Sequence, residues 1–579
     1  MGILALVLLG AVSYSYLKVD RLPPLSFPIV NVTIQYPQAA AQDVETLVTK
    51  PVEDALAGIP GAQTISSTSS EGRSQVRVQF VEGANMDISA LDVERRVSRI
   101  RGRLPVDAGD PSIAKADPNE FPIMNVALTG APMDQLRDLA TTQLQPALQS
   151  VLGVASVNIS GGLVREVQVT LDYSKLAAYN LTAQQVATAL TSANVTSTVG
   201  SYEDSGRLFS MRAIGNFQTP EQMGNLVVAQ TTGGPVLLRD LATVSPGYKD
   251  LREIQRINGE DAVGISIVKA SDANALQVAD DVRAAMAAIQ PTLPAGTRVL
   301  IRNDASIFTR ASLHAVQFDL MLAVIIVGFI TFLFLHSFRN VLIILLSIPT
   351  SMISTFLVMF AMGFSLNLMT LMALALMVGI LVDSSIVVVE NIHRHLQLGK
   401  EPREAALVGR NEIGLATIAI AAADVVVYVP IAFMSGGVGQ LFRQYGLTVV
   451  AATIFSVIIS FTLTPMLASR WMKHDHEGKG PIARFGAWWD ARFDVLARIA
   501  QRTVPIAVKA RWGVVLVAVV LVAASVMLVQ TRAIGSEYAP QEDNDNFQVI
   551  MTTPPGTSLL ATDAATKQFE EALQAIPEV

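Results

Sequence analysis

"GILVDSSIVVVENIHRHL", residues 379–396, reads as most of a membrane-spanning helix with a carboxylate, Asp383, set among leucine, isoleucine and valine. A charged side chain at the centre of a bilayer costs at least ~2.5–3.5 kcal/mol, so an acid at that depth is a candidate functional group. The rest of the sequence shows whether a membrane surrounds this stretch and what the carboxylate does there.

The composition favours a membrane protein with large polar portions. The 579 residues are 51% hydrophobic and 16% charged, and the formal net charge is −7. A chain of this length is too long for one core, and its negative charge argues against a general nucleic-acid binder. The chain has no cysteine, which excludes disulfides, thiolate metal sites and a cysteine nucleophile.

Seven apolar stretches predict membrane spans, because a span needs about 20 apolar residues. The first, residues 1–17, is shorter than this and is interpreted as a clipped span. A signal peptide is the alternative, but no small-residue cleavage site precedes Lys18. The other six stretches follow a long polar region and occupy residues 315–336, 341–362, 366–396, 413–434, 446–468 and 512–530.

Basic residues predict the orientation, because cytoplasmic loops carry an excess of lysine and arginine. Alternate connections between the spans are rich in these residues, and the remaining two contain only Arg443. The region 18–312 and the residues after 530 are therefore expected on the opposite side of the membrane from the cytoplasm. The basic connections are 336–340, 393–412 and 470–511.

Two features belong to the cytoplasmic side. Residues 472–511 include a run of spaced aromatic and arginine residues, which predicts an amphipathic helix on the inner leaflet. His393 and His395, and the "HDH" at 474–476, suggest metal ligands. Histidines two residues apart lie on different faces of a helix, so a cytoplasmic polar cluster is the preferred interpretation.

The polar region 18–312 alternates strand and helix patterns. Segments such as "VNVTIQY" (30–36) and "VGISIVK" (263–269) alternate apolar and polar residues, and helical patterns such as 41–56 lie between such strands. The repeated order of strand and helix predicts small α+β sandwiches of the βαβ kind.

An internal duplication is also visible. Residues 30–61 align without a gap on residues 547–578, at a constant offset of 517. Both copies share a strand–proline–helix–Ile-Pro pattern, and both follow a hydrophobic span. Duplicated halves are common in transporters, so residues 531–579 are expected to open a truncated second half and the chain to be an N-terminal fragment. The identities include Pro37/Pro554, Lys50/Lys567, Glu53/Glu570 and Pro60/Pro577.

These features resemble the resistance–nodulation–division (RND) permeases, and among them the hydrophobe/amphiphile efflux pumps of bacterial inner membranes. The motifs are "GILVDSSIVVVENI", "FLFLHSFRNVLI" (332–343), "PIAFMSGGVGQLFRQYGLTVV" (430–450) and "FTLTPMLASRW" (461–471). The resemblance covers essentially the whole chain. It implies an α-helical polytopic bundle with large extracytoplasmic porter domains. The implied parts are porter subdomain 1 at 18–118, porter subdomain 2 at 119–172 and 262–312, and a docking-like subdomain at 173–261.

The resemblance also implies a function. Such a protein exports small amphiphilic or hydrophobic compounds from the periplasm and inner membrane, confers multidrug resistance, and uses the proton as its coupling ion without a cofactor. It works as a homotrimer with a periplasmic adaptor protein and an outer-membrane channel. Where multidrug relatives line a deep pocket with phenylalanines, the matching residues here are Thr129 and Ser160, which become the candidate substrate-binding residues.

Asp383 is the main candidate for the proton site. Apolar surroundings disfavour the charged form of a carboxyl group, and a proton that crosses 100 mV releases ~2.3 kcal/mol. The alternative is a protonated, structural aspartate bonded to a neighbouring helix. Ser384 is expected to contact a helix rather than relay protons. Glu390, about 10 Å further along the helix, is either a second relay group or an acid that reaches the membrane interface.

Asp424 lies near the centre of the next span, at the depth expected for Asp383. Many RND relatives carry two adjacent aspartates on the fourth helix, whereas this chain has Asp383 followed by Ser384. Asp424 is therefore a candidate for the second carboxylate. The alternative is a protonated Asp424 that bonds a backbone or serine oxygen.

Two other functions stay open at this point. One is an RND-type lipid exporter or protein-translocation auxiliary. The other is an intramembrane aspartyl protease that uses Asp383 and Asp424, although that class expects a Gly-x-Gly-Asp turn and Gly379 is followed by Ile-Leu-Val-Asp. The relatives' catalytic lysine comes from the second half, so the chain is expected to be inactive alone.

Overall fold

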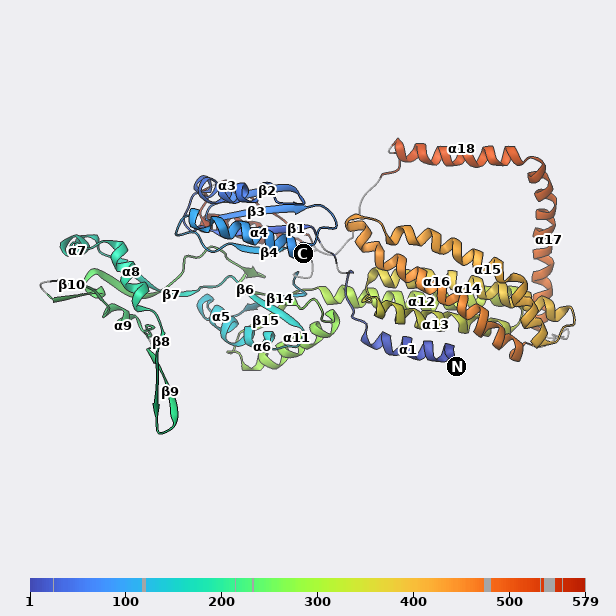
Figure 1. Cartoon of the computed structure of the whole chain (residues 1–579), viewed down its shortest axis with the longest axis horizontal. Helices are drawn as coiled ribbons and strands as arrows, with labels where there is room; N and C mark the ends of the chain where they lie inside the picture. The colour runs from blue at the N-terminus through green and yellow to red at the C-terminus, as the bar shows by residue number, and fades with distance from the viewer. Residues whose placement is uncertain are drawn as a thin grey trace. The chain divides into compact units, whose positions relative to one another are not determined.

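The chain folds into two compact units, shown in the computed structural model of Figure 1. The first comprises Met1–Phe121, Ser271–Gln277 and Ala305–Ile550, and the second comprises Pro122–Ala270, Val278–Asp304 and Met551–Val579. The structure describes residues 1–23, 25, 27–116, 121–213, 215–231, 234–472, 481–531, 533–535, 547–554 and 556–577.

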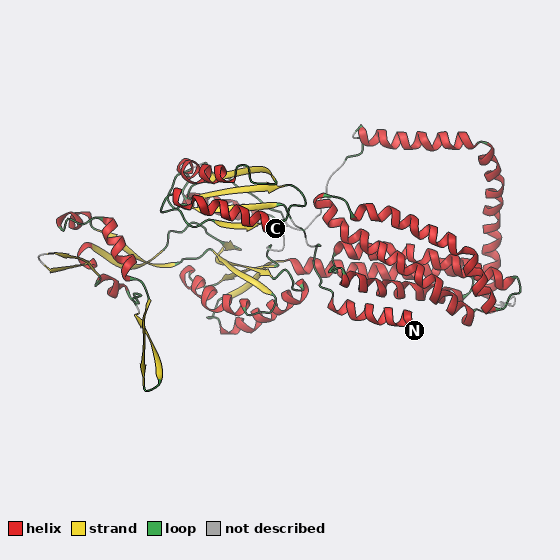
Figure 2. Ribbon diagram, in the orientation of Figure 1, coloured by secondary structure: helices red, strands yellow, loops and turns green. Residues whose placement is uncertain are grey.

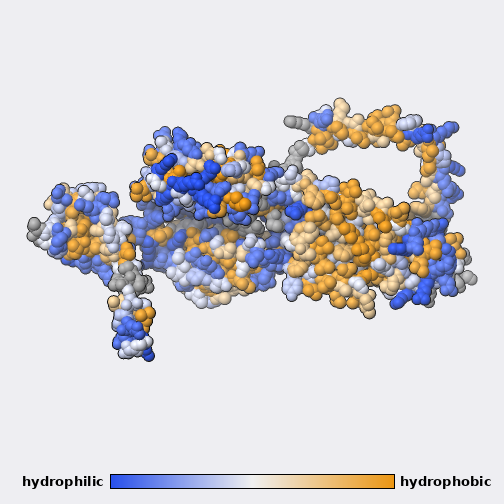
Figure 3. Space-filling model, in the orientation of Figure 1, coloured by the Kyte–Doolittle hydropathy of each residue, from blue (hydrophilic) through white to orange (hydrophobic). Residues whose placement is uncertain are grey.

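Long apolar helices make up most of the first unit (Figure 2), and hydrophobic side chains cover their outer surface (Figure 3). In the described part of the chain, six helices are long and apolar enough to cross a membrane. The helix α1 (Gly2–Tyr16) is apolar but has only 15 residues. The six are α12 (Ala305–Leu335), α13 (Phe338–Ala361), α14 (Leu368–Gln397), α15 (Pro402–Ala432), α16 (Gly436–Trp471) and α18 (Arg511–Gln530).

Each span expected from residue 315 onward overlaps one of these helices. Three of the helices, α12, α15 and α16, begin well before the apolar stretches that predicted them, at Ala305, Pro402 and Gly436. Apolarity marks only the part of a helix that lies in hydrocarbon, whereas the helix itself continues into polar surroundings. The expected amphipathic segment contains α17 (Pro481–Lys509), and residues 473–480, with the histidines at 474 and 476, lie outside the described residues.

The helices α14 and α16 form the centre of the bundle. In each, 56% of the most apolar stretch is buried, against 17% in α15 and 0% in α18. The Oγ of Ser456 on α16 donates to the carbonyl oxygen of Leu381 on α14 over 2.9 Å. Apolar side chains surround this hydrogen bond: Ala373, Met377 and Leu381 of α14 pack with Val449 and Ala452 of α16.

The start of α14 is fixed by Asn367. Its side-chain oxygen accepts from the backbone N–H groups of Met369 and Thr370, which otherwise have no partner in the first turn. Its Nδ2 donates to the Oε1 of Gln444 on α16 over 2.6 Å, and both side chains are buried. One amide therefore caps α14 and joins it to the neighbouring helix.

The first unit also contains a four-stranded antiparallel sheet in the order β2-β3-β1-β4. Alternation along β1 and β3 places every second side chain in a core with α4 (Met86–Ile100), as the sequence predicts for an α+β sandwich. The strands are β1 (Ile29–Gln35), β2 (Ala62–Ser70), β3 (Arg73–Phe80) and β4 (Ser112–Lys115), and a helix formed by α2 (Ala41–Val44), a π-helical turn (Glu45–Thr49) and α3 (Lys50–Leu56) also covers the sheet.

The second unit is built on a five-stranded antiparallel sheet in which β14 pairs with β5, β6 and β13. Its strands are β5 (Met124–Thr129), β6 (Val154–Ser160), β13 (Arg256–Ile257), β14 (Glu260–Lys269) and β15 (Arg298–Asp304). The accompanying helices are α5 (Met133–Leu139), a π-helical turn (Ala140–Leu144), α6 (Gln145–Gln149) and α11 (Ala275–Ile289).

A separate core lies within residues 165–248. Here β7 (Arg165–Leu171) pairs with β12 (Ala242–Tyr248) and with no strand of the five-stranded sheet. The docking-like subdomain was expected to begin at residue 173, after β7, and that boundary stays a prediction. The other elements are α7 (Tyr173–Ala178), α8 (Ala183–Ala193), α9 (Pro220–Gly224), α10 (Leu238–Leu241), β10 (Val227–Thr231), β11 (Gly234–Leu237) and the hairpin of β8 (Ser197–Asp204) and β9 (Arg207–Ala213).

The helix expected in the second copy of the repeat is present as α19 (Leu559–Gln574), which aligns on residues 42–57 of the first copy. Residues 547–554 form no strand, in contrast to the matching β1. In the first copy β1 lies between β3 and β4, which pair with both of its edges. A strand depends on such partners, and residues 547–554 have none among the described residues.

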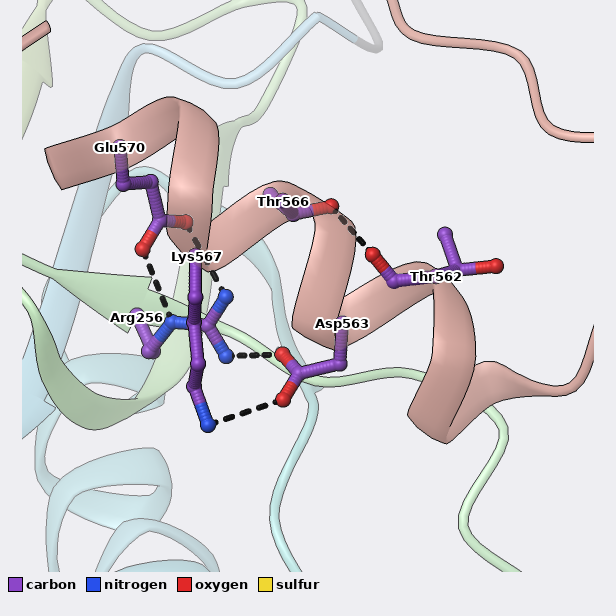
Figure 4. Close-up of polar contacts among 6 residues, drawn as sticks. All are labelled: Arg256, Thr562, Asp563, Thr566, Lys567 and Glu570. Atoms are coloured by element: carbon purple, nitrogen blue, oxygen red, sulfur yellow. Dashed lines mark hydrogen bonds and ion pairs between the residues drawn. The ribbon is translucent and has the colours of Figure 1, made fainter. Parts of the chain in front are cut away.

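Arg256, at the start of β13, binds α19 (Figure 4). Its Nε and Nη2 each donate to a carboxylate oxygen of Glu570 over 3.1 Å, and its Nη1 donates to Asp563. Only 8% of the Arg256 side chain is exposed. The Nζ of Lys567 lies 2.9 Å from the second oxygen of Asp563. The hydrogen bonds from Arg256 and Lys567 lower the pKa of Asp563 below its ordinary value.

Replacement of this guanidinium should release α19. In Arg256→Gln the bidentate contact with Glu570 is lost, so the backbone amides of α19 should exchange with solvent faster, while those of β14 stay unchanged. Hydrogen exchange followed by mass spectrometry measures both segments. The exposed neighbour Arg252→Gln is the matched control, and equal exchange in the two variants would contradict the role of Arg256.

The same contact predicts an acid response. A carboxylate whose pKa is lowered in the folded state adds stability at any pH above its unfolded pKa, and this stability disappears as the pH falls through the lowered value. The protection factors of the α19 amides, in which the intrinsic pH dependence of exchange is divided out, should therefore be constant from neutral to mildly acidic pH and fall only below the ordinary pKa of an aspartate.

Candidate functional site

Asp383 lies on one exposed stripe of α14. Met372, Leu376, Gly379, Asp383 and Glu390 are all exposed, and their spacing places them on one side of the helix. The residues that flank Asp383 are buried: Val382 is 1% exposed and Ser384 is 5% exposed. The carboxylate therefore projects from the side of α14 that the other described helices leave uncovered.

Asp424 is close to Asp383. It is half-buried on α15, which packs antiparallel against α14. The two carboxyl groups lie within range of an electrostatic interaction with each other. The structure thus brings together the two acids that the sequence placed at the same depth on consecutive spans.

The hydroxyl groups next to Asp383 lie on the packed side of α14. Ser384 is buried on this side, where a helix-contact residue would lie. Ser385 is fully buried, and its Oγ has no hydrogen-bond partner among the described residues. Its usual acceptor within the helix, the carbonyl of Leu381, instead accepts from Ser456. Ser385 was not predicted, because a serine in a membrane helix resembles any other helix-contact residue in sequence.

Glu390 shares the exposed stripe with Asp383, seven residues further along α14. This separation corresponds to about 10 Å along the helix axis, which is too far for direct proton transfer between the two carboxyl groups. Its two interpretations from the sequence, a second relay group and an acid at the membrane interface, both stay predictions.

A polar cluster joins the ends of α14 and α15 beyond Glu390. The Nε2 of His395 lies 2.6 Å from an oxygen of Glu412, and the same oxygen accepts from the Nδ2 of Asn391 over 3.2 Å. The Nδ2 of Asn391 also donates to the backbone oxygen of Gly409 over 2.8 Å. The sequence interpretation of a polar cluster included His395 but missed Glu412, which lies in the next helix. Among the described residues, no three potential ligands gather as a metal site.

The two candidate substrate residues occupy different environments. Thr129, at the end of β5, is fully buried. Its Oγ1 donates to a carboxylate oxygen of Glu260 and to the backbone oxygen of Asp261, each over 3.0 Å. Glu260 also pairs with Arg298 at 2.7 Å, and the pKa of Glu260 is lowered first by Arg298 and then by Thr129.

Ser160, at the end of β6, lines a pocket of about 290 Å³. The Nε2 of Gln255 donates to its Oγ over 2.8 Å. Thr129 and Ser160 flank β14, where they pair with Ala262 and Gly264, but Thr129 does not line the pocket. The lining combines the charged residues Arg137, Lys249, Arg252, Asp250 and Glu253 with the apolar residues Ile159, Val164 and Leu251.

Gly161 and Gly162 shape this pocket. Both have φ of +74°, a conformation that a residue with a side chain rarely adopts. The Nη1 of Arg137 donates to the backbone oxygen of Gly161 over 2.7 Å, so the turn after β6 is fixed by a charged side chain. No aromatic residue occurs among the described residues that line the pocket, which agrees with the absence of phenylalanine at positions 129 and 160.

The model of the AcrB/AcrD/AcrF family matches residues 1–579, the whole chain. Proteins of this family are transporters rather than enzymes, so the two aspartates are not the dyad of an intramembrane protease. The six long apolar helices agree with a chain that crosses the membrane several times. The protein thus belongs to the AcrB/AcrD/AcrF family of RND efflux permeases, multi-pass transporters of the inner membrane.

Proposed function

We propose that the protein is a proton-driven permease that exports small amphiphilic or hydrophobic compounds, with Asp383 as the group that binds the coupling proton. The observation that carries this proposal is the carboxylate of Asp383 on the uncovered side of a membrane helix, beside the charge of Asp424. Two like charges in a medium of low dielectric constant disfavour each other, so protonation of one relieves the repulsion. Such a pair titrates as a unit.

The uncovered stripe of α14 supports a second part of the proposal. A carboxylate at this depth needs either a proton or a cation, because its charge is poorly solvated by lipid. In RND relatives a lysine from the second half of the transporter supplies that cation. We propose that such a lysine lies opposite Asp383 when the proton has left.

The orientation and the assembly belong to the proposal as well. Positive-inside asymmetry supports a periplasmic location for the sheet-containing region 18–312, where the substrate enters. The hairpin of β8 and β9 exposes Tyr202, Leu208, Phe209 and Met211, and exposed apolar side chains on an arm favour contact with another chain. A homotrimer with a periplasmic adaptor and an outer-membrane channel follows from the resemblance to RND pumps.

One observation favours the alternative of a lipid exporter. The pocket beside Ser160 carries Arg137, Lys249 and Arg252, and it contains no aromatic surface among its described lining residues. Three cations against two acids suit an amphiphile with an anionic head group better than a flat aromatic drug. The substrate range of the Ser160 variant described below separates these two classes.

Asp383→Asn should abolish export by the intact transporter. Asparagine keeps the shape of the side chain and cannot bind and release a proton, so assembly should be normal while coupling is lost. Substrate efflux from loaded cells measures export, and the amount of folded protein in the membrane is the control. If the asparagine variant exports at the rate of the parent, Asp383 has only a structural role.

Asp424→Asn should reduce export strongly if Asp424 provides the second carboxylate. The addition of Ser384→Asp to this variant should restore part of the activity, because the second acid then lies on α14. The restoration should be incomplete, since position 384 is only 5% exposed and a carboxylate there is less well solvated. Full export by Asp424→Asn alone would exclude a role for Asp424 as the second carboxylate of the proton site.

Ser160→Phe should change the range of exported compounds, whereas Thr129→Phe should lower folding stability. Phenylalanine at 160 enters the pocket and should shift the exported compounds toward aromatic drugs, through stacking. Phenylalanine at 129 has no space, because Thr129 is fully buried, and overpacking should cost about 1–3 kcal/mol of folding stability. Resistance profiles and thermal unfolding measure the two effects. An unchanged profile in Ser160→Phe would remove the pocket from the substrate path.

A further inference from the structure

The helices α14 and α15 are joined at one level by three polar side chains. Asn391 and His395 of α14 are 8% and 7% exposed, and both contact the same oxygen of Glu412 on α15. Asn391 additionally donates to the backbone oxygen of Gly409. Apolar contacts between Ile392, Leu396, Ala405 and Ala406 surround these hydrogen bonds.

The backbones of the two helices approach closely at this level. A Cβ atom added to Gly409 would lie 3.1 Å from the backbone N and Cα atoms of Ile392. This is tighter than most Cβ contacts in proteins, so glycine suits the close approach of the two helices. Because the backbones are this close, the Nδ2 of Asn391 can donate to the main-chain oxygen of Gly409 on the other helix. The contact therefore fixes the backbone of α15 and not only its side chains.

The position of this contact determines where the two aspartates lie. Asp383 is twelve residues before His395 on α14, and Asp424 is twelve residues after Glu412 on the antiparallel α15. Twelve residues correspond to about 18 Å along either helix, so a contact between His395 and Glu412 places the aspartates at the same height. A slip of one residue would rotate Asp424 by about 100° around its helix.

We infer that Asn391, His395 and Glu412 act as positioning residues, a register clamp that holds Asp424 opposite Asp383. The role given to the clamp rests on the proposed proton function of the two aspartates, but the geometry of the clamp can be tested separately. The half-exposed Glu412 accepts from both α14 donors, and Arg394 adds a longer ion pair at 3.7 Å on the exposed side. The clamp thus has a buried part, from Asn391 to Gly409, and a partly exposed part at Glu412.

The absence of cysteine from the sequence makes a direct test simple. Asp383→Cys combined with Asp424→Cys gives a chain with two thiols, and a short bifunctional thiol reagent links them only if they face each other. In membranes, the parent pair should link efficiently. Addition of His395→Leu or of Glu412→Ala should reduce the yield about fivefold, the factor that corresponds to loss of one hydrogen bond.

Matched variants separate the clamp from general damage. His395→Gln keeps an N–H donor near the position of Nε2 and should retain the parent yield. His393→Leu changes a histidine two residues away, whose Nε2 contacts Gln397 instead of α15, and should also retain it. Glu412→Ala removes a half-exposed side chain, so it should report on the clamp even if His395→Leu does not fold.

A low yield in the parent pair, or a yield that is unchanged in both His395→Leu and Glu412→Ala, would overturn the inference. The proposed proton function fails by a different result, namely normal export by Asp383→Asn. If export depends on Asp383 but crosslinking does not depend on His395 or Glu412, the proton site stands and the clamp is wrong. If crosslinking depends on the clamp and Asp383→Asn exports normally, the clamp stands without that function.

Discussion

The carboxylate of Asp383 inside an apolar helix constrains the arrangement of the surrounding bundle. Such a group loses much of its hydration in lipid, so the side of the helix that carries it needs a proton or a polar partner. In this protein α14 packs against its neighbours through most of its surface and leaves one stripe uncovered, and Asp383 lies on that stripe. The hydrogen bonds at the two ends of α14, from Asn367 to Gln444 and from Asn391 to Gly409, hold the helix so that this side stays open.

Local patterns in the sequence predicted much of the architecture. The apolar stretches located the long helices, and the alternation in residues 30–36 and 263–269 located β1 and β14. The pairing of β7 with β12 could not be predicted, because the two strands are far apart in the chain and periodicity carries no information on partners. The same limit explains why residues 547–554, which resemble β1 in sequence, form no strand among the described residues.

The part of the candidate site that could be predicted consists of charged residues within apolar segments. Asp383 and Asp424 were found because each interrupts an apolar run, and their equal depth follows from their positions in consecutive spans. The environment of Thr129 was not predictable, since a residue at the end of a strand looks the same in sequence whether it faces a cavity or the core. Glu412 was missed because its importance depends on His395 of the preceding helix, and only the packing of α14 on α15 brings them together.

The central claim is that export is driven by protons that pass through the site at Asp383. Its most direct test measures proton movement and substrate export together in proteoliposomes that contain the intact transporter. The account predicts that an imposed pH gradient drives substrate movement, that protons move in the opposite direction in a fixed ratio to substrate, and that a protonophore stops both. Substrate export that continues at the same rate after the pH gradient and the membrane potential are collapsed would contradict it.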